Sequence, residues 1–274
     1  MHPVLFQIGP ITVHAYGALY ALGILAAITL SEYLFKKDGG EAGVITDLAF
    51  PVVIGVILGA RALFIFVERE YYFRNPTEIL MIWKGGLVFY GGLMGGVLAF
   101  IIMTRLKKME LWHLADTIAP GIALGHGIGR IGCFLAGSCY GRPTSVAWAV
   151  TYSDPTSLAG DILGIPVHPA QLYSASFLFL LSGILILIRN RSFFRGQVIT
   201  SYGVLYGTFR FFIEFLRGDP RGTVALADIT LSTSQAVSLV LVPLSLGLYM
   251  YLRARGAKDD RGAILLQDHI EPSL

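Results

Sequence analysis

Two apolar stretches of the sequence carry arginines at positions where a lipid bilayer disfavours charge. Arg130 lies within residues 126–141, and Arg210 lies within residues 206–220. An arginine at the centre of a membrane helix costs about 2.5–3.5 kcal/mol on insertion scales, so such residues usually face a bundle interior and serve a function. A guanidinium fork matches a phosphate with two hydrogen bonds. The two arginines therefore predict an anion site inside the membrane, and a lipid phosphate is the expected anion.

The second stretch places four polar side chains on one helical face. Tyr206, Arg210, Glu214 and Arg217 follow one another at intervals of 4, 4 and 3 residues, which are the spacings of neighbours on a helix surface. Arg210 and Glu214 can pair, which lowers the cost of burying either, and Arg217 is expected to reach the outer surface. One interpretation is a salt-bridged stripe between helices. The other is a functional site, because ionisable residues inside a membrane usually mark one.

Arg130 lies among glycines at residues 125, 127, 129, 132 and 137. Small residues let helices approach closely, but close packing explains the glycines and not the guanidinium, so we expect Arg130 to contact phosphate. His126 lies one helical turn inward on the same face, about 5.4 Å along the axis. It is either a packed, hydrogen-bonded histidine or a proton acceptor, which the neighbouring arginine would hold in its neutral form.

Two further segments could contribute to this site. Tyr90 is followed by Gly91 and Gly92 at the outer start of an apolar stretch. A tyrosine there either anchors the helix at the membrane interface or lines the site. His168 precedes a proline at the start of the apolar stretch over residues 170–188, and it either caps that helix or belongs to the site.

Arg61 and the two cysteines leave alternatives open. Arg61 is either a further phosphate contact or the partner of Glu68. Cys133 and Cys139 could form a disulfide on the outer face, remain free thiols, or pack as small residues. Two cysteines are too few for a disulfide framework, and their separation of six residues does not match a zinc pattern. We therefore expect no metal site.

The composition indicates an integral membrane protein. Hydrophobic residues make up 54% of the chain and charged residues 14%, whereas a soluble domain has about 25% charged residues. The mean hydropathy is +0.65. The net charge of +3 comes from basic residues between the apolar stretches, so no nucleic-acid partner is indicated. We expect no cleavable signal peptide, because no Lys or Arg precedes the first apolar run.

Seven stretches are long enough to span a bilayer, which takes about 20 apolar residues. They cover residues 15–35, 46–67, 86–104, 112–134, 170–188, 198–217 and 234–253. With the N-terminus outside, the inner side carries Lys36, Lys37, Arg105, Lys107, Lys108, Arg189, Arg191, Arg195, Arg253, Arg255, Lys258 and Arg261, and the outer side only Arg69, Arg74, Lys84, Arg142 and Arg221. The positive-inside rule then predicts an N-out, C-in orientation. The expected fold is an all-α polytopic membrane protein with about seven transmembrane helices.

Three segments complete the expected single membrane domain over residues 1–274. Residues 68–85 are typical of an amphipathic interfacial segment, with Tyr71, Tyr72 and Trp83 as belt aromatics. Residues 137–169 form the largest piece outside the spans. The β-prone run Val146–Tyr152 and the turn residues after it predict a small β-containing head there. The polar residues 256–274 are expected to form a cytoplasmic tail.

The motifs, taken together, resemble the prolipoprotein diacylglyceryl transferase family. The family signature is approximately Gly-Arg-Ile-Gly-Asn-Phe-x-Asn-Gly-Glu-x-x-Gly, and residues 129–141 read Gly-Arg-Ile-Gly-Cys-Phe-Leu-Ala-Gly-Ser-Cys-Tyr-Gly. Tyr16–Gly17, Gly85–Leu93, His168–Tyr173 and Tyr206–Arg217 match further family motifs. All of these matches run in the family's order from residue 16 to residue 217.

The resemblance implies a multi-pass enzyme of the bacterial inner membrane, with seven helices, a periplasmic head and its active site toward the periplasm. It implies transfer of the diacylglyceryl group of phosphatidylglycerol to the lipobox cysteine of a preprolipoprotein, forming a thioether and releasing glycerol phosphate, with no cofactor. Arg130 and Arg210 match the family's critical arginines. The candidate substrate-binding residues are Tyr16, Arg61, Gly91, Gly92, Gly141, Gln171, Tyr206, Glu214 and Arg217.

Some positions depart from the family pattern. Tyr90 stands where the family has a histidine, Cys133 where it has asparagine, and Ser138 where it has glutamate. That histidine is a candidate base in the family, so we hypothesise that His126 shares the proton-acceptor role here and that Tyr90 positions the phosphate or the thiol. A non-catalytic lipid or anion transporter and an inactive paralogue that binds lipoprotein precursors are the alternative functions. The inverted repeats that a transporter predicts are not evident in the sequence.

Overall fold

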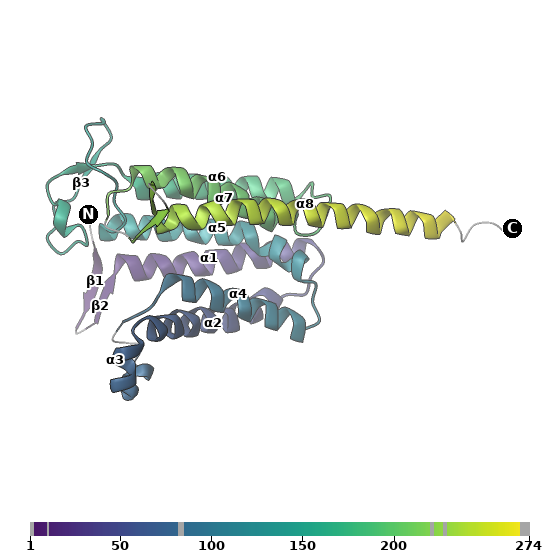
Figure 1. The fold of residues 1–274 in the computed structure, drawn as a ribbon, viewed down its shortest axis with the longest axis horizontal. Helices are drawn as coiled ribbons and strands as arrows, with labels where there is room; N and C mark the ends of the chain where they lie inside the picture. Colours follow the sequence, from purple (N-terminus) through teal and green to yellow (C-terminus); the bar gives the residue numbers. More distant parts are fainter. Residues whose placement is uncertain (1–2, 10, 82–84, 220–221, 227–228, 269–274) are drawn as a thin grey trace. The chain divides into compact units, whose positions relative to one another are not determined.

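The structure is a computed structural model of residues 1–274 that describes residues 3–9, 11–81, 85–219, 222–226 and 229–268. Long helices dominate the described residues (Figure 1). They are α1 (Ala15–Lys37), α2 (Val44–Val67), α4 (Phe89–Leu106), α5 (Leu111–Ala136), α6 (Ala170–Arg189), α7 (Gln197–Ile213) and α8 (Thr233–Asp268). The shorter helices are α3 (Arg69–Arg74), η1 (Pro76–Leu80), η3 (Gly160–Ile162) and η4 (Glu214–Leu216).

Within the described ranges, six helices are long and apolar enough to cross a membrane: α1, α2, α4, α5, α6 and the Thr233–Gly256 part of α8. Their outward faces are apolar, as in α2, where Phe50, Leu58 and Phe66 are exposed. These helices confirm the prediction of a mostly helical, multi-pass membrane protein. The stretch predicted as a span at residues 198–217 folds as α7 with 17 residues, about 26 Å long at 1.5 Å per residue, followed by the 3-10 turn η4.

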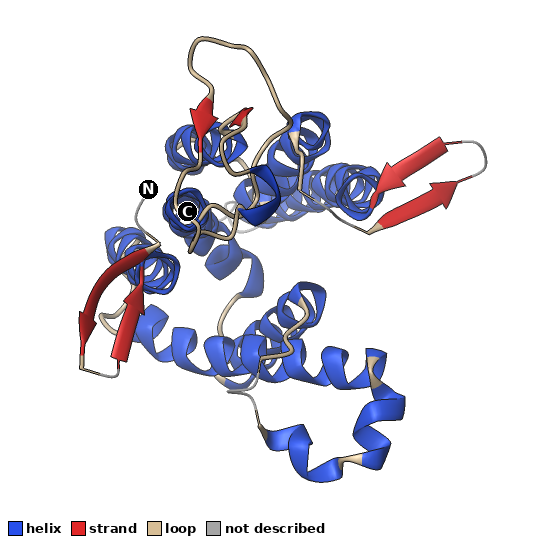
Figure 2. Cartoon of the chain, turned by 90° about the vertical axis from the view of Figure 1, so that its left-hand side faces the viewer, coloured by secondary structure: helices blue, strands red, loops and turns tan. Residues whose placement is uncertain are grey.

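The sheets are small antiparallel pairs, and Figure 2 shows their strands in red. The pairs are β1 (Val4–Ile8) with β2 (Ile11–His14), β3 (Val150–Thr151) with β4 (Pro166–Val167), and β5 (Thr223–Leu226) with β6 (Ile229–Ser232). β3 lies in the run that the sequence marks as β-prone. The hairpins β1–β2 and β5–β6 were not predicted, because strands of four or five residues give little periodicity to recognise.

The segment between α2 and α4 differs in part from its expected interfacial character. Tyr71 is exposed, as a belt aromatic should be, but Tyr72 is 7% exposed and packs edge-on against Phe64. Trp83 lies outside the described residues. At the other end of the chain, α8 continues through Asp268, so part of the expected polar tail is helical.

The chain divides into two compact units, which are described separately. The small unit is Glu32–Leu114, and in it α2 and α4 lie side by side (Figure 1). Glycines permit this approach. A Cβ atom added at Gly55 would lie 2.7 Å from the carbonyl oxygen of Gly95, and one added at Gly59 would lie 2.8 Å from the Cα of Gly95. Gly91 meets Gly59 in the same way.

The large unit comprises Met1–Ser31 and Ala115–Leu274. Its helices also pack through small residues: a Cβ added at Gly23 of α1 would lie 2.6 Å from the carbonyl oxygen of Gly125 in α5. On the other side of α5, a buried apolar core joins it to α6 and α7. The core residues are Ala119, Ala123, Leu178, Leu181, Leu185 and Val198.

A carboxylate from α5 fixes the start of α7. Asp116 accepts hydrogen bonds from the backbone N–H of Gly196 at 2.7 Å and of Ile199 at 2.9 Å. Gly196, which precedes the helix at φ 90°, has no side chain to cap it, so Asp116 supplies the acceptor that the first turn of a helix needs. The negative charge of Asp116 also interacts favourably with the positive N-terminal end of the α7 helix dipole. This contact therefore sets the register of α7, which carries Arg210, against α5, which carries Arg130.

Candidate functional site

Arg130 and His126 of α5 meet Tyr206 of α7 inside the large unit. The Nε–H of Arg130 donates to Nε2 of His126 at 3.2 Å, and the guanidinium is within hydrogen-bonding reach of the Tyr206 hydroxyl. The His126 and Tyr206 rings pack edge-on with centroids 5.3 Å apart. Because a guanidinium cannot accept a hydrogen bond, Nε2 of His126 holds a lone pair and the imidazole is neutral. A neutral imidazole is the form that a proton acceptor requires.

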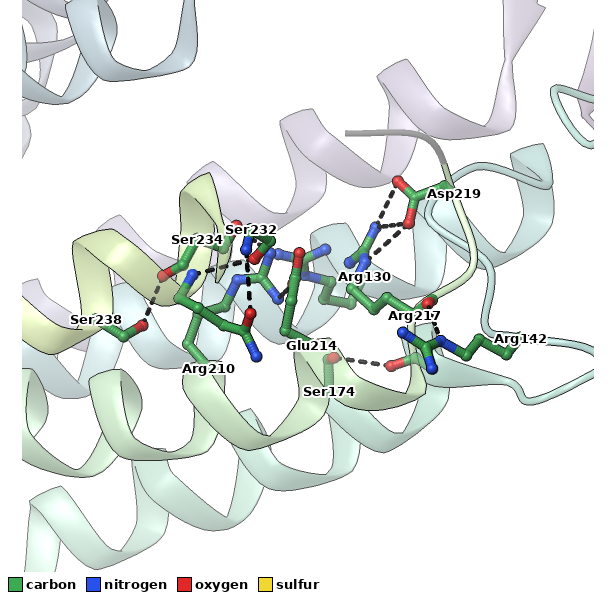
Figure 3. Close-up of polar contacts among 12 residues, drawn as sticks. Arg130, Arg142, Ser174, Arg210, Glu214, Arg217, Asp219, Ser232, Ser234 and Ser238 are labelled. Carbon is green, nitrogen blue, oxygen red and sulfur yellow. Dashed lines mark hydrogen bonds and ion pairs between the residues drawn. The ribbon is translucent and has the colours of Figure 1, made fainter. Parts of the chain in front are cut away.

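Arg210 forms the second part of the cluster (Figure 3). Its Nη1 lies 2.5 Å from Oε2 of Glu214, as the four-residue spacing predicts. Its Nη2 donates to Oγ of Ser234, in the first turn of α8, at 2.7 Å. The Arg130 and Arg210 guanidiniums are both close enough to His126 to act on it electrostatically. The structure thus brings the two predicted arginines into one cluster.

Arg217 is positioned differently from the sequence expectation. It is 6% exposed rather than reaching the outer surface, and it makes a bidentate pair with Asp219 at 2.9 and 3.0 Å. The cause is that α7 ends at Ile213 and the chain continues as η4, so Arg217 leaves the face that Arg210 and Glu214 share. Its backbone carbonyl accepts a hydrogen bond from Nε of Arg142 in the head at 3.1 Å.

The end of α5 brings the two cysteines together as free thiols. Gly137 adopts φ 79°, and the next residue, Ser138, donates its N–H to the carbonyl of Cys133 at 3.0 Å, which is the pattern of a Schellman cap. Because the chain changes direction at this cap, Cys139 lies close to Cys133. A hydrogen bond from Cys133, helped by the nearby Arg217 guanidinium, holds the pKa of the Cys139 thiol below its usual value. The structure contains no disulfide between them, and Cys133 is buried, as the packing alternative expects.

Gln171 and Tyr16 lie near this end of α5. Gln171 is 1% exposed, and its Nε2 donates to the carbonyl of Ser138 at 2.7 Å and to the Tyr152 hydroxyl at 2.9 Å. It thereby ties α6 to the turn after α5 and to the head core. Tyr16 of α1 is close enough to Arg130 and to both cysteines to interact with them electrostatically.

His168 acts through its ring and its backbone. Nδ1 lies 3.3 Å from the Tyr173 hydroxyl, which also accepts a 2.6 Å hydrogen bond from Nε1 of the exposed Trp148. The backbone carbonyl of His168 accepts a hydrogen bond from the N–H of Gly141 at 3.0 Å. The contacts of His168 thus join the head to the start of α6, and Gly141 lies where the backbones are closest.

The remaining predicted residues lie in the small unit. Tyr90 is the second residue of α4, and its ring packs edge-on against Phe89 with centroids 5.6 Å apart. Gly91 and Gly92 are buried against α2. Arg61 is buried, and its guanidinium points at backbone carbonyls between Glu78 and Gly86.

Sequence reasoning missed two members of the site, Ser234 and Asp219. Ser234 reaches Arg210 because the β5–β6 pair returns the chain to the C-terminal end of α7. A serine in a first helical turn is too common to signal a site. Asp219 lies two residues after Arg217. Residues two apart do not face each other on a helix, so the expected helical face did not predict this pair.

Known proteins resemble this chain over nearly its whole length. The family model described as prolipoprotein diacylglyceryl transferase matches residues 3–251. A protein of Clostridium tetani named phosphatidylglycerol–prolipoprotein diacylglyceryl transferase is 39% identical over 242 residues, covering 88% of this chain and 94% of that protein. Proteins with the same name from Clostridium perfringens (there numbered 2) and Bacillus velezensis are 36% and 32% identical, covering 94% and 96% of this chain and 98% and 96% of their own lengths. The chain therefore belongs to the prolipoprotein diacylglyceryl transferase family.

Proposed function

We propose that the chain transfers the diacylglyceryl group of phosphatidylglycerol to the lipobox cysteine of a preprolipoprotein. The thiol sulfur attacks the glycerol carbon that bears the phosphate. An S–C bond forms as the C–O bond breaks, glycerol phosphate leaves with the electron pair, and the thiol proton passes to a base of the site. The names of the relatives supply the two substrates. The observation that carries the proposal is the buried cluster of Arg130, His126, Arg210 and Glu214.

The charges of this cluster suit a phosphate leaving group. Glu214 offsets the charge of Arg210, and Asp219 offsets that of Arg217. The contacts of Arg130 with His126 and Tyr206 are made to neutral groups. Arg130 is therefore the cation best placed to bind the phosphate, with Arg210 stabilising the charge that develops as the C–O bond breaks.

We also infer that α7 spans the membrane like the other six helices, in an N-out, C-in bacterial inner-membrane protein. It lies alongside α6 and α8 (Figure 1) and returns the chain from the basic end of α6 at Arg189. Arg130 is six residues from the end of α5 and Arg210 three residues from the end of α7, about 9 and 5 Å from those ends. This orientation puts both guanidiniums near the periplasmic side.

The reaction can be tested directly with the purified protein in detergent or vesicles. Incubation with phosphatidylglycerol and a synthetic lipobox peptide should add the mass of one diacylglyceryl group to the peptide and release one glycerol phosphate. A peptide with serine in place of the lipobox cysteine is the control. Lipid binding without a peptide adduct would support a transporter or an inactive paralogue instead.

Neither cysteine of the enzyme should carry the diacylglyceryl group, because the acceptor thiol belongs to the substrate. We expect Cys133→Ala and Cys139→Ala to keep at least about a third of the transfer rate, since a conservative change outside the reacting groups costs well under 1 kcal/mol of transition-state stabilisation. Initial rates of peptide modification measure this. A lipid adduct trapped on Cys133 or Cys139 during turnover would contradict the direct transfer and indicate a two-step reaction.

His126→Gln should lower turnover more than tenfold, while Tyr90→Phe should have the milder effect. Glutamine can still accept the hydrogen bond from Arg130 Nε through its amide oxygen, but it cannot take up a proton at neutral pH. A phenol is an inferior proton acceptor to a neutral imidazole, so Tyr90 is expected to orient a substrate. The kcat of each variant and its binding of phosphatidylglycerol are the measurements. The reverse order of effects would assign the proton-acceptor role to Tyr90 and a structural role to His126.

A further inference from the structure

The guanidinium of Arg61 donates hydrogen bonds to backbone carbonyls that precede α4 in the chain. Nε donates to the carbonyl of Ile79 at 3.1 Å, and Nη1 donates to those of Gly85 at 2.8 Å and Gly86 at 3.3 Å. Nη2 donates to the carbonyls of Glu78 at 2.6 Å and Met81 at 3.5 Å. A guanidinium has five N–H donors, and five carbonyl contacts are made here. We call this arrangement the carbonyl clasp.

The surroundings of the clasp hold the guanidinium in place. Arg61 is 6% exposed, and its cation lies 5.2 Å from the centroid of the Tyr72 ring and 5.9 Å from that of the Phe64 ring. Gly86 has φ 78°, and a Cβ atom there would contact the Phe64 ring and lie 2.9 Å from Arg61 Nη1. Only glycine fits that position, because both the backbone angle and the close approach exclude a side chain.

The clasp determines where α4 begins. The N–H of Val88 donates to the carbonyl of Ala60, the neighbour of Arg61, at 3.1 Å. α4 starts at the next residue, Phe89, and Tyr90 follows. Two adjacent residues of α2 therefore fix the chain on either side of Leu87 and so set the height and rotation at which Tyr90 enters the helix.

We propose that Arg61 is a positioning residue of the transferase, which holds the carbonyls of residues 78, 79, 81, 85 and 86 and thereby sets the position of Tyr90 during turnover. The inference rests on the proposed role of Tyr90 in orienting a substrate. It assigns the buried charge of Arg61 to the protein backbone rather than to the lipid phosphate. A buried arginine with five carbonyl contacts cannot bind a phosphate bidentately unless it releases some of them.

The competing role is direct contact with the phospholipid. Arg61, Tyr71, Tyr72 and Glu78 border a cavity of about 320 Å³ that a headgroup could enter. A phosphate contact predicts weaker lipid binding when Arg61 is replaced, and partial rescue by lysine, which keeps the charge. The clasp predicts a loss of turnover with lipid binding retained, and no rescue by lysine, because an ammonium group has only three donors and cannot span the five carbonyls.

The experiment compares Arg61→Met and Arg61→Lys with Gly86→Ala, which disturbs the same clasp from the backbone side. Arg69→Met is the matched control, since Arg69 is exposed in α3 and stacks on Phe66 at 6.0 Å. In the first three variants we expect kcat to fall about tenfold or more, with KM for phosphatidylglycerol within about twofold of wild type. Amides 78–81 and 85–88 should exchange with deuterium faster, while those of α5 and α7 keep their protection. The control should match wild type in all readouts.

A double-mutant cycle connects the clasp to Tyr90. If Arg61 acts through Tyr90, adding Tyr90→Phe to Arg61→Met should lower kcat by less than about twofold further, because coupled residues are not additive. The idea is overturned if kcat in Arg61→Met equals wild type, if only KM for phosphatidylglycerol rises and lysine restores it, or if the two effects multiply. Wild-type kcat in Tyr90→Phe alone would reject the role of Tyr90, while the transfer assay on the wild-type protein tests the reaction independently.

Discussion

Replacing Arg210 by alanine is expected to abolish diacylglyceryl transfer while the protein still assembles in the membrane. The Arg210 side chain is 12% exposed and its guanidinium pairs with Glu214 at 2.5 Å. It acts on His126 electrostatically together with Arg130. Removing one preorganised donor from a site of developing negative charge typically costs about 10²–10³ in kcat. Arg130→Ala should have an effect at least as large. The measurement is the initial rate of peptide modification with saturating phosphatidylglycerol.

Lysine at either position tests the geometry separately from the charge. Arg210→Lys should remain at least about tenfold below wild type, since an ammonium group is a point charge without the planar fork. Near-normal activity in Arg210→Lys would refute the bidentate contact, and near-normal activity in Arg210→Ala would remove Arg210 from the site. Arg189→Ala is the control, because Arg189 lies in the last turn of α6, at the opposite end of that helix from the head. Detergent melting curves show whether the Glu214 carboxylate, once its Arg210 partner is removed, has destabilised the fold.

The membrane helices could be predicted from hydropathy because bilayer thickness fixes their length and composition. The spans predicted at 15–35 and 170–188 became α1, Ala15–Lys37, and α6, Ala170–Arg189. The Arg210–Glu214 pair could also be predicted, since it depends on helical spacing within one element. α7 was harder to delimit, because its C-terminal end is set by the turn η4 and by contacts with the head, which hydropathy does not report.

Contacts between separate elements could not be read from the sequence. The alternatives for Arg61, a phosphate or Glu68, both assumed a charged partner, whereas the structure supplies backbone carbonyls of η1, Met81, Gly85 and Gly86, which lie 17 to 25 residues further on. Backbone carbonyls cannot be recognised as partners from the sequence, because every residue has one. Ser234 became a partner of Arg210 only through the unpredicted hairpin β5–β6. Motifs thus identified the arginines, and tertiary packing decided what each arginine contacts.

Gly141→Ala is expected to remove most of the transfer activity, by at least about tenfold, although Gly141 bears no side chain that could bind a substrate. Its N–H donates to the His168 carbonyl at 3.0 Å, and its backbone pairs with Arg217 in an isolated β-bridge. A methyl group there would contact that same carbonyl and lie 2.9 Å from the carbonyl oxygen of Leu216. Because both obstacles are backbone, they cannot rotate away as a side chain could.

The strain should therefore separate the head from the turn that follows α7 and displace Arg217 with its partner Asp219. Gly160→Ala is the matched control, since a Cβ atom at Gly160 of the same head meets nothing within 4 Å. Initial transfer rates of the two variants, normalised to folded protein, measure the difference. If Gly141→Ala works as well as Gly160→Ala, the head and the end of α7 can shift without cost, and the backbone junction does not hold Arg217 for catalysis. A selective loss in Gly141→Ala would mean that the family motif requires glycine at this position for the approach of two backbones rather than for contact with the lipid.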